Sequence, residues 1–251
     1  MIRQSYSRSE RILRLRRAMS SIPGVTWLTE LIYKAKAQPD LKTCLAGIEL
    51  EHPLGVASGL DRTGAYCSVA ASHGAAFLEI GPLHDVRGAI ANLRENPSPV
   101  PVLANISGSE EEKSFQLIYD FVDAVVLNIP PMNFEGATID RILQLRQFND
   151  EYKPVLFKFN DAVTDENMDK AVDFALSSGI DGIIVPRRLL ENTVSLSSAH
   201  LDVMCCGVFE NAADVASALE AGAVAVAITN KPDVYGPSFI KKTLKNLQKK
   251  I

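Results

Sequence analysis

Eight short apolar runs, each followed by a turn and a segment of helical periodicity, constrain the fold of this chain more than any other feature. In the segments between them, apolar residues recur with the i, i+3, i+4, i+7 spacing of one helix face, as in residues 168–175 and 212–219. Eight strands alternating with helices predict an α/β protein with a (β/α)8 TIM barrel, because a doubly wound sheet would leave two strands without a place. Only the link 187–200 is too short and irregular to predict a helix. The apolar runs are residues 54–58, 76–80, 101–105, 123–128, 154–159, 182–186, 201–206 and 223–229.

The N-terminal residues stand apart from this pattern. Two helical segments, about 8–20 and 25–37, flank Pro23-Gly24, and the first 17 residues hold six Arg against one Glu. We therefore predict two parts, an N-terminal helical extension of residues 1–38 and a barrel of residues 39–251. One interpretation of the extension is a small helical module that lies on an anionic membrane. The other is a helical cap packed on the barrel, with its arginines in solvent.

Composition and charge exclude several functional classes. The chain has 251 residues, of which 47% are apolar, enough for one large core. A net charge of -4 argues against nucleic acid as a partner. No run approaches the roughly 18 apolar residues of a membrane span, and the N-terminus has charge where a signal peptide needs an apolar region. We expect a cytoplasmic protein, held on the membrane interpretation as a peripheral protein at the inner face.

The four cysteines predict neither a metal site nor disulfides. Cys44, Cys67, Cys205 and Cys206 show no C-x-x-C spacing. Successive residues of a strand point to opposite faces, so Cys205 and Cys206 would face different sides. We interpret all four as reduced thiols, mostly in the core.

Three polar residues close adjacent strands at the end where TIM barrels carry their function. Asn105 closes the third run, Asn128 closes the fourth, and Lys158 interrupts the apolar fifth run near its end. A buried lysine without a partner is too unfavourable to keep, so Lys158 must meet an anion, a polar ligand or water at the barrel mouth. A strand-end Asn alone is typical of turn chemistry, but three such residues on adjacent strands favour a polar ligand pocket.

Longer motifs surround these residues. They are HPLGVASGLDRTGAY (52–66), FLEIGPLH (77–84), PVLANIS (101–107), VVLNIPPMN (125–133), PVLFKF (154–159), GIDGIIVP (179–186) and EAGAVAVAITNKPDVYGPSFIKK (220–242). In these motifs, and in their order, the chain resembles the dihydroorotate dehydrogenases, flavin enzymes of pyrimidine synthesis, over nearly its whole length. Its N-terminal helices resemble those that form the quinone tunnel of the membrane-linked class, which favours the membrane interpretation.

The resemblance implies a set of ligand contacts at the barrel mouth. Arg62 replaces a family lysine near substrate and flavin, and Lys158 matches the lysine that contacts the flavin. The implied FMN contacts are Gly59, Asn105, Asn128, Lys158, Gly207, Thr229, Asn230 and Lys231. The implied substrate contacts are Arg62, Asn133 and Arg187.

The departures from the family pattern fall on functional positions. The family's Ser or Cys base is replaced by Pro131, which has neither a titrating group nor an N–H. Pro186 and Arg187 replace a Thr-Asn pair that contacts flavin and substrate, and a Gly-rich segment beyond them is missing. At the phosphate end, Val208 and Lys231 stand where the family has glycines. The lysine could offset the lost N–H contacts by charge pairing or could lie in solvent.

Three hypotheses follow. The first is a divergent or inactive relative that binds a small molecule without oxidising dihydroorotate, because its base position is Pro131. The second is a working FMN-dependent oxidoreductase that uses water or another base; of the barrel histidines His73, His84 and His200, only His84 follows a strand at the functional end. The third, a phosphate-ligand isomerase or lyase, has only the fold behind it.

Overall fold

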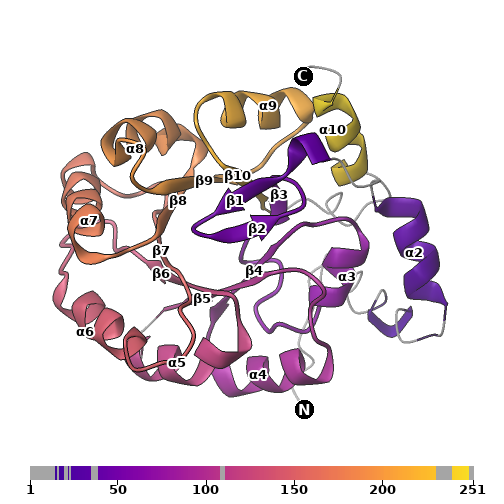
Figure 1. The fold of residues 1–251 in the computed structure, drawn as a ribbon, viewed down its shortest axis with the longest axis horizontal. Helices are drawn as coiled ribbons and strands as arrows, with labels where there is room; N and C mark the ends of the chain where they lie inside the picture. Colours follow the sequence, from indigo (N-terminus) through magenta and orange to yellow (C-terminus); the bar gives the residue numbers. More distant parts are fainter. Residues whose placement is uncertain are drawn as a thin grey trace, which may run out of the picture.

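The computed structural model confirms the predicted barrel. It describes residues 15, 17–19, 22, 24–34, 39–107, 111–229 and 239–248. Eight parallel strands close in the order β10-β3-β4-β5-β6-β7-β8-β9, and helices surround them (Figure 1). The strands are β3 (Leu54–Val56), β4 (Leu78–Leu83), β5 (Val102–Ile106), β6 (Ala124–Asn128), β7 (Val155–Lys158), β8 (Gly182–Pro186), β9 (Asp202–Gly207) and β10 (Ala225–Ile228). Each falls on a predicted apolar run, and β4 extends three residues beyond its run.

The helices follow the strands as the periodicity predicts, with one addition. They are α3 (Cys67–Ser72), α4 (Val86–Glu95), α5 (Glu111–Ile118), α6 (Ala137–Arg146), α7 (Asp165–Ser178), α8 (Leu190–Ser197), α9 (Ala212–Glu220) and α10 (Phe239–Leu247), with 3₁₀ turns η1 (Pro39–Leu41), η2 (Tyr119–Phe121) and η3 (Arg187–Leu189). Helix α8 lies in the link where the sequence predicted none. Its inner face carries Thr193 and Ser197, whose hydroxyls donate to the carbonyls of Leu189 and Val194, so polar residues pack there without an apolar stripe.

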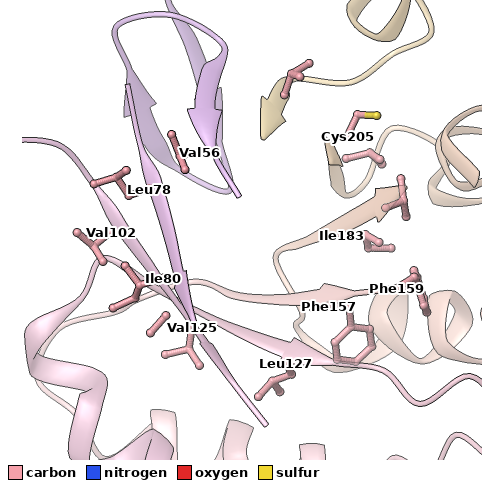
Figure 2. Packing of buried hydrophobic residues seen from close by; sticks show 14 of the residues in the cluster. Val56, Leu78, Ile80, Val102, Val125, Leu127, Phe157, Phe159, Ile183 and Cys205 are labelled. Carbon is pink, nitrogen blue, oxygen red and sulfur yellow. The ribbon is translucent and has the colours of Figure 1, made fainter. Parts of the chain in front are cut away.

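Side chains alternate between the two sides of the barrel wall. The outward residues pack against the helices, as Figure 2 shows for Val102, Val125 and Phe157 on successive strands. The inward residues form a second cluster that fills the barrel. In that interior a Cβ on Gly55 would come within 2.5 Å of the Phe77 ring, so the glycine makes room for the aromatic side chain. Cys205 faces outward and Cys206 inward, as predicted, and all four cysteines are free.

A hairpin that the sequence did not predict closes the N-terminal end of the barrel. Strands β1 (Thr43–Leu45) and β2 (Ile48–Leu50) pair antiparallel and cross the barrel opening in Figure 1. The backbone N–H of Ala46 donates to Asp202 Oδ2 at 2.7 Å, at the start of β9. Because this end is covered, the opposite, C-terminal end is the mouth where a ligand can approach.

The N-terminal extension is described in part. Helix α2 (Val25–Tyr33) ends four residues earlier than the sequence predicts and lies outside the helical ring, beside α3 (Figure 1). Tyr33 stacks on His73 with ring centroids 4.8 Å apart, and Lys241 Nζ donates to the Ile32 carbonyl at 2.9 Å. The outer face of α2 exposes Trp27, Leu28, Leu31 and Ile32. Among the described residues, no helix is long and apolar enough to cross a membrane.

Candidate functional site

A buried ion pair lies at the centre of the barrel mouth. Lys158 Nζ is 2.6 Å from both carboxylate oxygens of Glu79 and donates to Ser58 Oγ at 2.8 Å. The Glu79 side chain is fully enclosed, whereas 13% of the Lys158 side chain is exposed. Of the partners that the sequence allowed for Lys158, the structure shows an anion, the internal carboxylate of Glu79, which reaches it from β4 across the barrel interior.

Hydrogen bonds hold Glu79 in its charged form. Besides Lys158, Glu79 accepts from the backbone N–H of Ser58 at 3.0 Å and from Asn105 Nδ2 at 2.8 Å. Burial alone would raise the pKa of Glu79, but the charge of Lys158 and these hydrogen bonds outweigh it and hold the pKa below its ordinary value. The Glu79 carboxyl is thus ionised at neutral pH.

The two strand-end amides contact each other. Asn128 Nδ2 donates to Asn105 Oδ1 at 2.6 Å, and Asn105 Nδ2 reaches Asn128 Oδ1 at 3.3 Å. The strand register explains the contact, since Asn128 and Lys158 are direct partners in the β6–β7 ladder and Asn105 lies one strand away. Glu79, Lys158, Ser58, Asn105 and Asn128 form one hydrogen-bonded set, which we call the mouth cluster.

The loop after β3 supplies the rim above this cluster. Gly59 has φ of 98°, a conformation that favours glycine, and a Cβ built there would meet no atom within 4 Å. Asp61 is buried and accepts hydrogen bonds from Thr63 and from the N–H of Tyr66, which fixes the loop. Arg62, in the same loop, is exposed. Open space above Gly59 is compatible with a flat ligand.

The loop after β6 carries the prolines and is anchored from below. Asn167, buried at the start of α7, donates to the Pro130 carbonyl at 2.7 Å and accepts from the Phe134 N–H at 2.6 Å. Pro131 accepts from the N–H of Thr164 at 3.1 Å through its carbonyl. Asn133, the implied substrate amide, is exposed and has a left-handed φ of 59°. The structure therefore brings Asn128 into the mouth cluster, whereas Asn133 is solvent-exposed.

The strand ends on the other side of the mouth offer less polar chemistry. Pro186 is buried beside Cys206, its partner in the β8–β9 ladder. Burial raises the pKa of Cys206 to about 11, so the thiol stays protonated at neutral pH. Arg187 turns to Asp214 of α9, with Nη1 3.3 Å from Oδ1. Among the described residues, no three His, Cys, Asp or Glu side chains are placed to hold a metal ion.

The implied phosphate end is described only in part. Gly207 and Thr229 end adjacent strands, and the Thr229 N–H donates to the Gly207 carbonyl at 2.8 Å. Val208, at a glycine position of the family, is exposed. Asn230 and Lys231 lie outside the described residues.

The histidines offer no ready base beside the mouth cluster. His84 is exposed after β4, His73 is buried under Tyr33 at the end of α3, and His200 is exposed between α8 and β9, at the N-terminal end of the barrel. Only His84 lies at the functional end, as the sequence predicted.

Sequence reasoning missed the residue that holds the site together. Glu79 is the only charged residue in the run AFLEI, as Lys158 is in PVLFKF. A buried glutamate needs a counter-charge for the same reason as a buried lysine does. The available signal was that one apolar run contains a single negative charge and another a single positive charge. Asn167 gave no comparable signal, because an Asn near a helix start is typical of capping.

Comparison with known proteins identifies similar sequences and folds. No family model matches the chain. The sequence is 23% identical over 221 residues to a dihydroorotate dehydrogenase (quinone) of Bordetella avium, covering 65% of this chain and 63% of that protein. The structure resembles a ligand-free dihydroorotate dehydrogenase from Eimeria tenella, with a TM-score of 0.70, 16% identity and coverage of 94% of this chain and 95% of that one. It also resembles a mandelate oxidase variant with an FMN monooxide adduct, with a TM-score of 0.56, 17% identity and coverage of 88% and 86%.

Proposed function

We propose that this chain, a divergent member of the dihydroorotate dehydrogenase family by its similarities in sequence and fold, binds a flavin or a similar planar small molecule at the barrel mouth and does not oxidise dihydroorotate at a typical enzymatic rate. The observation that carries the proposal is the loop after β6. Residues 129–132 have no side chain that titrates, and Asn133, which follows them, is exposed. The reaction needs a base for one proton, and a positioned base contributes on the order of 10² to 10⁴ in rate.

The mouth cluster does not replace this base. Glu79 is bound by donors on both carboxylate oxygens, and Lys158 directs its N–H groups to Glu79 and Ser58. Cys206 is held as a neutral thiol by burial. A group that accepts a substrate proton must have a free lone pair at the mouth. The described residues around the cluster offer hydrogen bonds to a ligand but no such free base.

The residues at the mouth fit the ring of FMN better than its phosphate. Lys158 and Ser58 are polar groups at the mouth, and the space above Gly59 admits a flat ring. At the phosphate end, Val208 stands where the family has a glycine, and the Thr229 N–H is already bound to the Gly207 carbonyl. FMN would supply the acceptor for hydride when bound. The protein would contribute orientation of the ring and exclusion of water.

A working flavin oxidoreductase is the second candidate. The observation that favours it is His84, which is exposed after β4 at the functional end and is the barrel histidine placed where a substitute base is needed. The distinguishing measurements are flavin release from purified protein on denaturation and dihydroorotate-dependent reduction of a quinone or dye with added FMN. We expect flavin binding with turnover far below 1 per second. Turnover in the usual enzymatic range of roughly 1 to 10³ per second would contradict the first proposal.

Restoring the base position tests the same point. Pro131→Ser places a hydroxyl at the position of the family base. We expect it not to recover dihydroorotate oxidation, because Pro186 and Arg187 still replace polar substrate contacts and residues of a site act as a unit. Recovery by this single change would show that the loop is otherwise competent.

We also propose peripheral membrane contact through the N-terminal extension of residues 1–38. The outer face of α2 exposes four apolar side chains, among which Trp27 is 66% exposed. The first 17 residues of the extension carry six Arg. Trp27 is the only tryptophan, so its fluorescence reports on this face directly. Vesicles with anionic lipid should shift its emission to the blue, more than neutral vesicles do, and Leu31→Asp should abolish the shift. Phe148→Asp, at an exposed aromatic residue after α6, is the matched control. No shift with anionic vesicles would leave the extension as a cap on the barrel.

A further inference from the structure

We infer that Glu79 is a positioning residue for Lys158 and that it also sets the charge preference of the barrel mouth. Because the Glu79 carboxylate cancels the charge of the lysine, the mouth binds a ring with a neutral hydrogen-bonding edge in preference to an anionic ring. The inference rests on the proposed function, in which a flavin is that ring. It assigns to Glu79 the charge preference of the site, a role separate from the missing base.

The geometry fixes the lysine in one place. The carboxylate of Glu79 is itself immobile, because one oxygen accepts from the Ser58 N–H and the other from Asn105 Nδ2. Both oxygens then lie 2.6 Å from Lys158 Nζ. A flexible lysine stem held by two contacts to a rigid acceptor loses its freedom to follow a ligand. Any ring at the mouth must therefore adapt to the position that Glu79 gives to the ammonium group.

The same contacts leave one exchangeable hydrogen bond. The ammonium group has three N–H donors, and its remaining partner is the Ser58 hydroxyl at 2.8 Å. A hydroxyl rotates and can find another partner, whereas the carboxylate is enclosed. A carbonyl oxygen or ring nitrogen of a ligand can thus take the place of Ser58 without breaking the ion pair.

The charge balance of the mouth cluster is zero. Lys158 contributes one positive and Glu79 one negative charge, while Ser58, Asn105 and Asn128 are neutral. A ligand atom next to Nζ also lies close to the Glu79 oxygens, so attraction to the ammonium group is largely offset by repulsion from the carboxylate. A negative charge that develops on the ring gains little, and the oxidised ring should bind better than its reduced anion.

The first test measures the midpoint potential of bound FMN in the wild type, Glu79→Gln and Glu79→Asp. Removing the carboxylate charge should tighten binding of reduced flavin relative to oxidised flavin by about tenfold or more, which raises the midpoint by about 30 mV per tenfold for a two-electron couple. Glu79→Asp keeps the charge but not both contacts, so its midpoint should stay closer to that of the wild type than the Glu79→Gln midpoint does. A midpoint in Glu79→Gln equal to that of the wild type would overturn the charge argument.

The second test needs no flavin. Trace acetylation followed by mass spectrometry measures how readily Lys158 reacts as an uncharged amine. Loss of the carboxylate in Glu79→Gln should raise labelling of Lys158 by about tenfold, because the amine is no longer held by two short contacts to an enclosed carboxylate. Lys170 in Glu166→Gln is the control, since this exposed pair has a similar N–O distance of 2.7 Å and should change little.

The outcomes separate the two proposals. Unchanged Lys158 labelling in Glu79→Gln overturns the positioning role, whether or not flavin binds. Raised Lys158 labelling in Glu79→Gln, together with a wild-type protein that does not bind FMN, supports the role of Glu79 and rejects the proposed flavin site. If Glu79→Gln fails to fold, Glu79→Asp decides, because its shorter side chain cannot keep both contacts and should raise labelling several-fold; wild-type labelling in that variant overturns the inference.

Discussion

The buried imidazole of His52 should make the stability of the barrel depend on pH. His52 precedes β3 and is only 9% exposed. Its Nδ1 accepts from the Leu54 N–H at 3.2 Å, and the ring also makes a hydrogen bond to the backbone of Gly74. Burial lowers the pKa of His52 from 6.5 to about 4, because the charged imidazolium would lose its hydration. Protonation would also take away the lone pair that accepts from Leu54.

The sign and size of the effect follow from proton linkage. Below pH 6.5 the unfolded chain binds a proton at His52 that the folded chain does not bind until about pH 4. The free energy of unfolding therefore falls as the pH falls, by up to about 1.4 kcal/mol per pH unit and by about 3 kcal/mol in total at pH 4. This is a substantial part of the roughly 5–15 kcal/mol by which a domain is stable.

Urea denaturation from pH 7.5 to 4, followed by circular dichroism, measures this dependence. His52→Gln keeps a side chain with a donor and an acceptor but removes the titration. The variant should be less stable at pH 7.5 and should lose less stability between pH 6.5 and 5. That interval separates His52 from Glu79, whose pKa is lowered from 4.5, so that its contribution is present above 4.5 and is lost only as the pH falls below that value. His84→Gln, at an exposed histidine, is the matched control. Equal slopes for the wild type and His52→Gln over this interval would refute the reasoning.

Three further predictions concern the mouth and the extension. Lys158→Met should lower the free energy of unfolding by about 3–5 kcal/mol in urea titrations, because it leaves the Glu79 carboxylate buried and unpaired. Adding Glu79→Gln to the same chain should recover most of this loss. A double variant whose loss equals the sum of the two single losses would contradict the pairing. Asn167→Ala should lower the free energy of unfolding by about 1–3 kcal/mol and speed amide hydrogen exchange of residues 132–134, because the loop after β6 loses two hydrogen bonds to a buried side chain. Unchanged exchange would show that the prolines alone fix the loop. Removal of residues 1–38 should leave a barrel that unfolds cooperatively in urea, since the described contacts of α2 are with the outside of α3 and α10; aggregation or loss of cooperativity would instead make the extension part of the core.

The barrel strands could be predicted because parallel strands covered on both sides must be apolar throughout. Runs such as 124–128 and 182–186 therefore stand out from the sequence without any tertiary information. The hairpin β1–β2 could not be found in this way. Its strands have three residues each, and its turn uses Ala46 at a φ of 50° where Asn or Asp is typical. The turn is stabilised by Asp202, 156 residues away, a contact that no local pattern reveals.

In the candidate site, too, positions could be predicted from the sequence but contacts between distant side chains could not. Asn105, Asn128 and Lys158 could be placed at the mouth because a strand end is a position in the sequence. The partner of Lys158 could not be placed, since it depends on which side chains meet across the barrel interior. For Arg187, the position after β8 could be predicted from the sequence, but the direction of the side chain could not. The structure places its Nη1 3.3 Å from Asp214 Oδ1 of α9, a contact that no local pattern reveals.

The mouth cluster and the proline loop together favour binding over catalysis. A buried ion pair is weak support for stability, because well-packed apolar residues of similar size often stabilise as much or more. The barrel of this chain needs no Glu79 and Lys158 to stay closed, since its inward cluster of apolar side chains already fills the interior. The polar groups at the mouth are therefore better explained by a ligand that uses their hydrogen bonds. Beside them, the loop after β6 carries Pro130 and Pro131 and is held by Asn167, so on the proposed function a bound ligand would meet a rigid wall without a proton acceptor.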